Sequence, residues 1–347
     1  EHSSDEAVIF FTSGSTGKPQ GVRLSHWNVA ELACYVGRSL QCSSGTVAAW
    51  WTKLSWVASL PELFGMLCSG GCVRVVADAR RGDLTSACRN DFTGITHLQC
   101  SPSVCISFLE SGHPWPASLK ALVLTGESLP ARVVHAAHAA HPHGYGQLQV
   151  WNHYGQTEAT DTTCAHPCTD CERIDVPMGR PIQGRGVIVD EDGVLWVAGD
   201  SAVALGHLES RSALDGFCEY HGHHAFRTGD CASWRGDVLM FKGRRDAQVK
   251  VAGQRVELAE VEAAILAFTC VRATKVVLVE GVLTAYVLAD MGDALIAQIA
   301  EHCRSVLPPH MLPRILALDT WPMRGVHGNG KLDAGMLRAP AWCAWRD

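Results

Sequence analysis

The feature that most constrains this chain is a loop of hydroxyl and glycine residues that directly follows an apolar run. Residues 8–11 are β-branched or aromatic, which predicts a buried strand. The loop after this run consists of Thr12, Ser13, Gly14, Ser15, Thr16, Gly17 and Lys18. Its amides and hydroxyls can converge on one anion, and glycine lets the backbone approach phosphate oxygens without an intervening Cβ. A flexible linker is the alternative, but the strand before the loop and the helix signal after it disfavour a linker.

Length, charge and cysteine use restrict the class of protein. A chain of 347 residues that is 47% hydrophobic with a net charge of −6 can form one large or two ordinary domains. Without a basic excess we expect no nucleic-acid partner, and no apolar run reaches the roughly 18 residues of a membrane span. Fifteen cysteines scattered through apolar segments predict reduced, mostly buried thiols and a cytoplasmic location.

Apolar runs alternate with helical patterns after the loop. Ser25 is a plausible N-cap, and apolar residues then repeat at helical spacing up to Leu40. Short apolar runs follow at residues 72–77, 95–100 and 119–124, the last of them leading into Thr125 and Gly126. Strands alternating with helices predict a parallel α/β sheet whose ligands gather at the carboxyl ends of the strands.

A second strong motif occupies residues 150–160. A predicted strand delivers Asn152, Tyr154, Thr157 and Glu158 into a turn that contains glycine. These residues offer an aromatic face for a base, a hydroxyl for a phosphate and a carboxylate for a hard cation.

The rest of the chain predicts an antiparallel region and then a small domain. Residues 187–197 are expected to form a hairpin, and Asp230 follows in what looks like a glycine turn. From residue 246 we expect a short strand, a helix over 256–268, a hairpin over 276–287 and a second helix over 295–306. The predicted fold class is α/β, with a parallel-rich sheet and an antiparallel region in a large portion (1–245) and a small α+β C-terminal domain (246–347).

The ordered motifs resemble those of the adenylate-forming superfamily, which includes acyl-CoA synthetases, aryl-acid ligases, luciferases and adenylation domains of nonribosomal peptide synthetases. The resemblance covers nearly the whole chain and implies an AMP-forming acid–thiol ligase that uses ATP and Mg²⁺. It implies activation of a carboxylic acid as the acyl-adenylate with release of pyrophosphate. Transfer to a pantetheine thiol of CoA or a carrier protein would follow. Family members carry a further portion upstream of the loop, so the large domain is expected to be N-terminally incomplete.

The resemblance also implies roles for individual residues. Tyr154 would stack on adenine, Asn152 would bond the edge of the base, Thr157 would contact the α-phosphate and Glu158 would bind Mg²⁺. Asp230 would hold the ribose hydroxyls and Arg244 would contact the same nucleotide. Lys331 would reach the carboxylate and the α-phosphate. The loop (Thr12 to Lys18) and Gly126 belong to the nucleotide site, Asp246 to a hinge, and Lys250 and Gly253 to the thioester step.

The predicted acid pocket departs from the family pattern in one informative way. Where adenylation domains for α-amino acids carry an Asp, this chain has Val57, which would leave a buried ammonium unpaired. We therefore predict an acid that lacks an α-amino group. Asp161 could meet an amino group farther along, as in a β- or ω-amino acid, or could be solvated. The remaining pocket residues by the same alignment are Ala58, Pro61, Gln99, Val123, Thr125, His153 and Thr162.

Two other interpretations stay open at the level of the sequence. One is a stand-alone acyl-CoA synthetase, which Val57 and Gln156 both allow. The other is a catalytically weak nucleotide- or acyl-binding module, which the missing upstream portion would favour. Glu158, Asp230, Arg244 and Lys331 favour the enzyme.

Overall fold

The computed structural model describes residues 2–12, 19–77, 80, 83–144, 146–169, 176–208, 216–245, 248–268, 270–279, 281–289 and 293–318. These residues pack into two compact units. The first contains residues 2–12 and 19–245, and the second begins at residue 248. Each unit has its own apolar core.

The main sheet of the first unit has seven strands in the order β4-β3-β5-β6-β7-β8-β9. The first five in this order are parallel, and the last two join antiparallel. Because β6 and β7 are parallel and adjacent, their carboxyl ends lie together, with Thr125 paired to His153. The strands are β3 (Val47–Trp50), β4 (Cys72–Val75), β5 (His97–Cys100), β6 (Ala121–Thr125), β7 (Gln149–Tyr154), β8 (Cys164–Cys168) and β9 (Arg180–Pro181).

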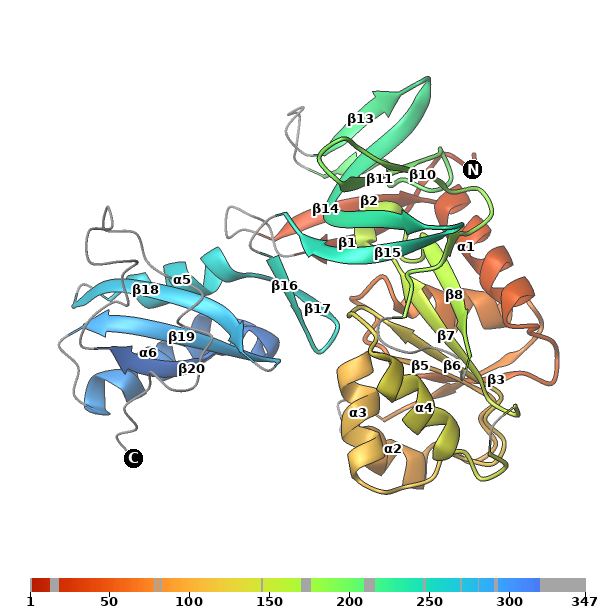
Figure 1. The fold of residues 1–347 in the computed structure, drawn as a ribbon, viewed down its shortest axis with the longest axis horizontal. Helices are drawn as coiled ribbons and strands as arrows, with labels where there is room; N and C mark the ends of the chain where they lie inside the picture. Colours follow the sequence, from red (N-terminus) through yellow and green to blue (C-terminus); the bar gives the residue numbers. More distant parts are fainter. Residues whose placement is uncertain are drawn as a thin grey trace. The chain divides into compact units, whose positions relative to one another are not determined.

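Helices cover both faces of this sheet (Figure 1). Leu122 and Leu124 pack with apolar residues of α2, α3 and α4, whereas Val123 between them packs in the cluster that includes α1. This alternation follows from the two-residue period of a strand whose two faces are both buried. The helices are α1 (His26–Ser39), α2 (Leu84–Asn90), α3 (Pro102–Glu110) and α4 (Ala131–Ala139), with one π-helical turn, η1 (Pro61–Gly65), packed on α1.

Two further sheets complete the first unit. A three-stranded sheet has the order β1-β2-β12, and a five-stranded sheet has the order β10-β11-β14-β13 with β15 also paired to β14. Their strands are β1 (Glu6–Thr12), β2 (Gln20–Ser25), β10 (Gly186–Val189), β11 (Val194–Ala198), β12 (Gly206–His207), β13 (Phe217–Tyr220), β14 (His223–Arg235) and β15 (Val238–Arg244).

The second unit combines two small sheets with two helices. β16 and β17 form a hairpin, and β18, β19 and β20 form a sheet in which β20 runs parallel to β19. Apolar residues of α5, α6 and the strands form one core, and Val261, Ile265, Val276 and Ile299 in it are fully buried. The elements are β16 (Gln248–Val251), β17 (Gln254–Glu257), α5 (Leu258–Leu266), β18 (Val271–Val279), β19 (Val282–Ala289), α6 (Asp293–Val306), η4 (Pro309–Met311) and β20 (Arg314–Leu318).

The structure confirms the α/β class with its parallel and antiparallel parts, as well as several local predictions. Ser25 is the N-cap of α1, where its Oγ accepts a hydrogen bond from the amide of Asn28 at 3.1 Å and its own amide donates to the Asn28 side chain. The hairpins predicted over 187–197 and 276–287 are formed by β10–β11 and β18–β19.

Four local predictions were wrong. The thiols are not mostly buried, because only five of the 13 cysteines in the described residues are buried. The run at residues 8–11 is not a buried strand, because β1 is the edge of a three-stranded sheet and Phe11 is 61% exposed. The helix expected over 256–268 begins at Leu258, because the residues before it belong to β17. Asp230 lies inside the long strand β14 and not in a turn.

Within the described part of the chain, no helix has both the length and the apolar character needed to cross a membrane.

Candidate functional site

A tight turn after β7, residues 155–163, carries four of the predicted site residues: Thr157, Glu158, Asp161 and Thr162. A Cβ built on Gly155 would lie 1.3 Å from the carbonyl oxygen of Asp161, so only glycine fits here. The turn closes through hydrogen bonds from the Asp161 amide to the Gln156 carbonyl (3.0 Å) and from the Thr163 amide to the Tyr154 carbonyl (2.7 Å). The short helix η3 (Thr157–Ala159) lies inside this turn, and it holds half-buried Thr157 and buried Glu158.

Asp230 is the centre of a hydrogen-bond network that joins the two larger sheets of the first unit. Its Oδ2 accepts from the Tyr154 hydroxyl and from Gln156 Nε2, both at 2.6 Å, and its Oδ1 accepts from Arg244 Nη1 at 2.5 Å. Tyr154 ends β7 in the seven-stranded sheet, while Asp230 and Arg244 are paired across β14 and β15. The structure therefore brings together three residues that the sequence places far apart.

Burial controls the electrostatics of this network. The side chains of Asp230 and Arg244 are only 2% and 11% exposed, so loss of either partner would leave a charge with little access to water. Burial raises the pKa of the Tyr154 phenol well above its usual value, and the negative charge of Asp230 raises it further. Tyr154 therefore stays protonated at neutral pH and acts as a hydrogen-bond donor.

Glu158 faces a histidine that comes from the three-stranded sheet. Glu158 Oε1 lies 4.0 Å from His207 Nε2, and the two side chains are 3% and 6% exposed. Neither ring nitrogen of His207 has a hydrogen-bond partner in the described residues. The carboxylate oxygens of Glu158 are the kind of ligand that Mg²⁺ prefers, so Glu158 fits the Mg²⁺ role that the resemblance implies.

The other predicted nucleotide residues that the structure describes lie at or near the carboxyl ends of β7, β6 and β1. Asn152 is buried in β7, where its Nδ2 donates to the carbonyl of Pro177 at 2.7 Å. Gly126 follows β6 with a positive φ of 91°. Thr12 ends β1 and its hydroxyl contacts the Gln20 carbonyl at 3.4 Å.

Part of the predicted acid pocket lines a small cavity between α1 and the sheet. This cavity of about 20 Å³ has room for about one water molecule. Its lining includes Pro61, Gln99, Val123 and His153 of the predicted set, and most of the other lining residues are apolar. Of the remaining predicted residues, half-buried Val57 packs against the apolar cluster of α1, and the Ala58 carbonyl accepts from Gln99 Nε2 at 2.7 Å. The structure does not place Val57, Ala58, Thr125, Asp161 or Thr162 on the cavity wall.

Two residues of the predicted acid pocket are ionisable and buried. Burial lowers the pKa of His153 to about 4, so its ring is neutral near pH 7. Asp161 is only 7% exposed, so the possibility that it is solvated was wrong. Its Oδ2 accepts from the Thr162 hydroxyl at 2.8 Å, and its negative charge acts on the buried guanidinium of Arg185.

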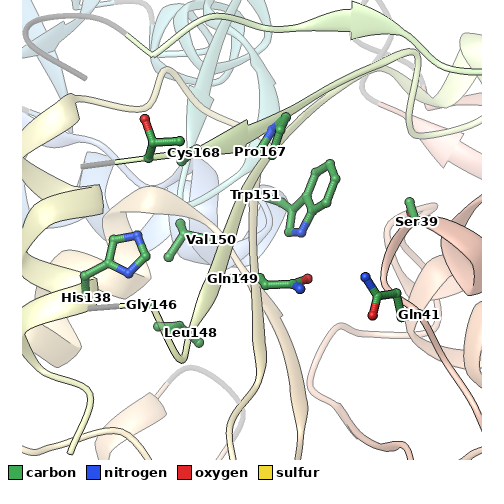
Figure 2. Close-up of a pocket in the computed structure, with 11 residues that line it drawn as sticks. Ser39, Gln41, His138, Gly146, Leu148, Gln149, Val150, Trp151, Pro167 and Cys168 are labelled. Atoms are coloured by element: carbon green, nitrogen blue, oxygen red, sulfur yellow. The ribbon is translucent and has the colours of Figure 1, made fainter. Parts of the chain in front are cut away.

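A larger cavity lies elsewhere in the first unit, around the start of β7 (Figure 2). It has a volume of about 560 Å³, which falls in the range of small-molecule sites. Gln149 and Trp151 project toward Gln41, whereas Val150 projects toward His138, as expected for alternating strand residues (Figure 2). It contains none of the predicted site residues, and the polar groups described above converge at the opposite end of β7.

Several predicted residues cannot be placed in either site. Ser13, Gly14, Ser15, Thr16, Gly17, Lys18, Asp246 and Lys331 lie outside the described residues. Lys250 and Gly253 belong to the second unit, in β16 and in the turn that connects it to β17.

Sequence reasoning missed two residues of the site. Gln156 donates to Asp230 and also to the Thr228 carbonyl at 3.1 Å, and His207 faces Glu158. Neither contact has a local sequence signal, because each depends on strands that meet only in the folded chain.

Comparison with known proteins agrees with the fold and the motifs. The model of the family described as AMP-binding enzyme matches residues 1–208. Malpinin synthetase of Mortierella alpina is 32% identical over 96% of this chain and 5% of its own length. The L-proline–[L-prolyl-carrier protein] ligase of Streptomyces coelicolor is 30% identical over 95% of this chain. The crystal structure of the Vibrio cholerae adenylation domain AlmE with glycyl-adenosine-5′-phosphate superposes over 97% of this chain with a TM-score of 0.83 and 25% identity.

This chain spans 65% of the Streptomyces ligase and 66% of the AlmE chain. The match of the family model nevertheless covers more than half of the 347 residues. The chain therefore belongs to the family of AMP-binding enzymes.

Proposed function

We propose that the chain is the adenylation part of an AMP-forming acid–thiol ligase. The observation that carries this proposal is the convergence of Tyr154, Gln156 and Arg244 on the buried carboxylate of Asp230. The network sets a fixed aromatic ring, a carboxylate and a guanidinium side by side, and these groups suit a base, ribose hydroxyls and a phosphate ester. Glu158, on the turn next to it, would hold Mg²⁺, which when bound neutralises phosphate charge.

The proposed first step joins a carboxylate to the α-phosphorus of ATP. A carboxylate oxygen forms a bond to phosphorus, the bond to the pyrophosphate oxygen breaks, and pyrophosphate leaves with the electron pair. No general base is needed because the nucleophile is already ionised. The residues of this chain would bind and orient the two anions, with Thr157 at the α-phosphate and with Lys331 in the role that the resemblance implies, at the carboxylate and the α-phosphate.

The second step would transfer the acyl group to a pantetheine thiol. The sulfur attacks the acyl carbon, AMP leaves, and the thiol proton is released to solvent. The Streptomyces relative is named as a carrier-protein ligase, which supports a carrier protein as the source of the thiol. We propose that the small domain turns about Asp246, replacing Lys331 by the region of Lys250 and Gly253.

The pocket supports an acid without an α-amino group. The small cavity is mostly apolar, and the carboxylate of Glu62 in its wall already accepts bonds from the Trp51 and Thr52 amides and the Thr52 hydroxyl at 2.7–3.1 Å. Val57, which packs against the apolar cluster of α1 outside the cavity wall, offers no counter-charge to a buried ammonium group. The proposal also allows a β- or ω-amino acid whose amino group reaches Asp161.

The experiment is carboxylate-dependent ATP–pyrophosphate exchange across α-amino, β-amino, aryl and fatty acids. We expect exchange with a class that lacks the α-amino group, and a loss of about 100-fold or more in Lys331→Ala. Best turnover with an α-amino acid would refute the proposed substrate class.

Nucleotide binding is measured separately by calorimetry with AMP. Asp230→Asn is expected to weaken AMP binding by about tenfold or more, because charged hydrogen bonds contribute about 1.5–3 kcal/mol. Asp192→Asn is the matched control, since Asp192 forms an exposed pair with Arg245 at 2.6 Å.

A second candidate is a nucleotide-binding module without turnover. The cavity of about 20 Å³ favours it, because an acid could enter only if the lining moves. This candidate predicts AMP binding that Asp230→Asn weakens to the same extent, together with no exchange for any acid.

A further inference from the structure

His207 has a buried side chain beside Glu158, and no hydrogen bond within the described residues accounts for either of its ring nitrogens. Its side chain is 6% exposed, yet neither Nδ1 nor Nε2 has a hydrogen-bond partner in the described part of the chain. Burying an imidazole without partners is costly, so such nitrogens in a polar site indicate a missing ligand.

The backbone fixes this imidazole against Glu158. His207 is paired with Val22 of β2, and the next amide, that of Leu208, donates to the Gly21 carbonyl at 2.7 Å. The turn that carries Glu158 is tied to the same segment, because the Ala204 amide donates to the Glu158 carbonyl at 2.9 Å. The rings of His207 and Phe217 pack in a T-shaped arrangement, with ring centroids 5.0 Å apart.

The distance between the two side chains suits a shared metal ion. Two ligand atoms that each lie about 2.1 Å from one ion can be at most about 4.2 Å apart. Glu158 Oε1 and His207 Nε2 are 4.0 Å apart, within that limit. Among the described residues no group of three or more His, Cys, Asp or Glu side chains could hold a metal, so the nucleotide phosphates and water would supply the other ligands.

We propose that His207 is a nitrogen ligand beside Glu158, so that the metal position of this chain prefers a divalent ion that accepts imidazole, such as Mn²⁺, over Mg²⁺. Mg²⁺ strongly prefers oxygen ligands, whereas later first-row ions bind imidazole more readily. The inference rests on the proposed function in one respect: the phosphate ligands of the ion would come from the bound nucleotide.

The test uses the full chain with Mn²⁺ and the non-hydrolysable analogue α,β-methylene-ATP, after labelling the protein with ¹⁵N-histidine. Pulsed electron paramagnetic resonance should detect ¹⁵N coupled to Mn²⁺, and the label separates histidine nitrogen from adenine nitrogen. The coupling should disappear in His207→Phe. It should persist in His224→Phe, a matched control because His224 also packs on Phe217 but engages the Ala204 carbonyl through Nε2 at 2.8 Å.

Affinity gives a second readout. His207→Phe should weaken Mn²⁺ binding by about tenfold or more, with a change of less than about threefold for Mg²⁺. His207→Asn should lose the ¹⁵N coupling in the same way and serves if the Phe variant does not fold.

Mn²⁺ bound without ¹⁵N coupling in the wild-type protein would overturn the proposal and leave His207 as a buried partner of the carboxylate. Equal losses of Mn²⁺ and Mg²⁺, or no Mn²⁺ binding, would also overturn it. AMP binding measured without divalent ions reports on the proposed function alone, so the two failures are distinguishable.

Discussion

At the scale of the residue, His153 shows how burial couples charge to folding. Its pKa is about 4 in the folded chain, compared with the usual value near 6.5. Between these two values the unfolded chain binds a proton that the folded chain does not, so the free energy of unfolding falls as pH drops from about 6.5 to 4. The full effect is about 3 kcal/mol, and it is absent above pH 6.5.

We therefore expect His153→Gln to flatten the pH dependence of stability between pH 4 and 6.5, measured by urea unfolding at a series of pH values. The exposed His221 is the control, and His221→Gln should leave the slope unchanged. An unchanged slope in His153→Gln would mean that folding does not lower the pKa of His153.

At the scale of the element, the turn of residues 155–163 depends on one glycine. Gly155→Ala would place a methyl group on the Asp161 carbonyl, so the turn that carries Glu158 could not close. We expect a loss of stability of about 3 kcal/mol or more, as for other severe backbone and packing conflicts. Gly45→Ala is the control, because the nearest atom to its added Cβ is 3.9 Å away and it should change stability by less than about 1 kcal/mol. Similar chemical-denaturation midpoints for both variants would contradict this account.

Local sequence patterns predicted where strands and helices occur better than they predicted which of them are buried. The apolar runs that became β5, β6 and β7, and the capping residue Ser25, are signals within a few residues and were found in place. An apolar run also predicted β1, but it predicted a buried strand. A run of apolar residues does not by itself reveal that the strand lies at the edge of a sheet.

The candidate site was less predictable than the elements. Family motifs named Tyr154, Asp230 and Arg244, but the bond from Gln156 to Asp230 spans 74 residues of sequence and depends on two sheets meeting. The contact between Glu158 and His207 is of the same kind, and no local period encodes it.

At the scale of the whole molecule, separate cores predict separate unfolding. Ile299 is fully buried in the core of the second unit and Leu195 in a core of the first. We expect Ile299→Ala and Leu195→Ala each to cost about 2–5 kcal/mol, in different units. In scanning calorimetry each variant should lower a different transition, and AMP binding should survive in Ile299→Ala. A single transition that both variants lower equally would show that the units unfold as one.

The arrangement around Asp230 also limits how such a chain can diverge. Three donors from β7, its turn and β15 share one buried acceptor. Replacing any member of this network leaves other buried polar groups short of a hydrogen-bond partner and without water to replace it. Tolerated substitutions at these positions should then be strongly epistatic: a change at Asp230 that is harmful alone becomes acceptable only when Arg244 changes with it. We therefore expect the four side chains to change together, so that neutral substitution in this network requires two or more compatible replacements at once.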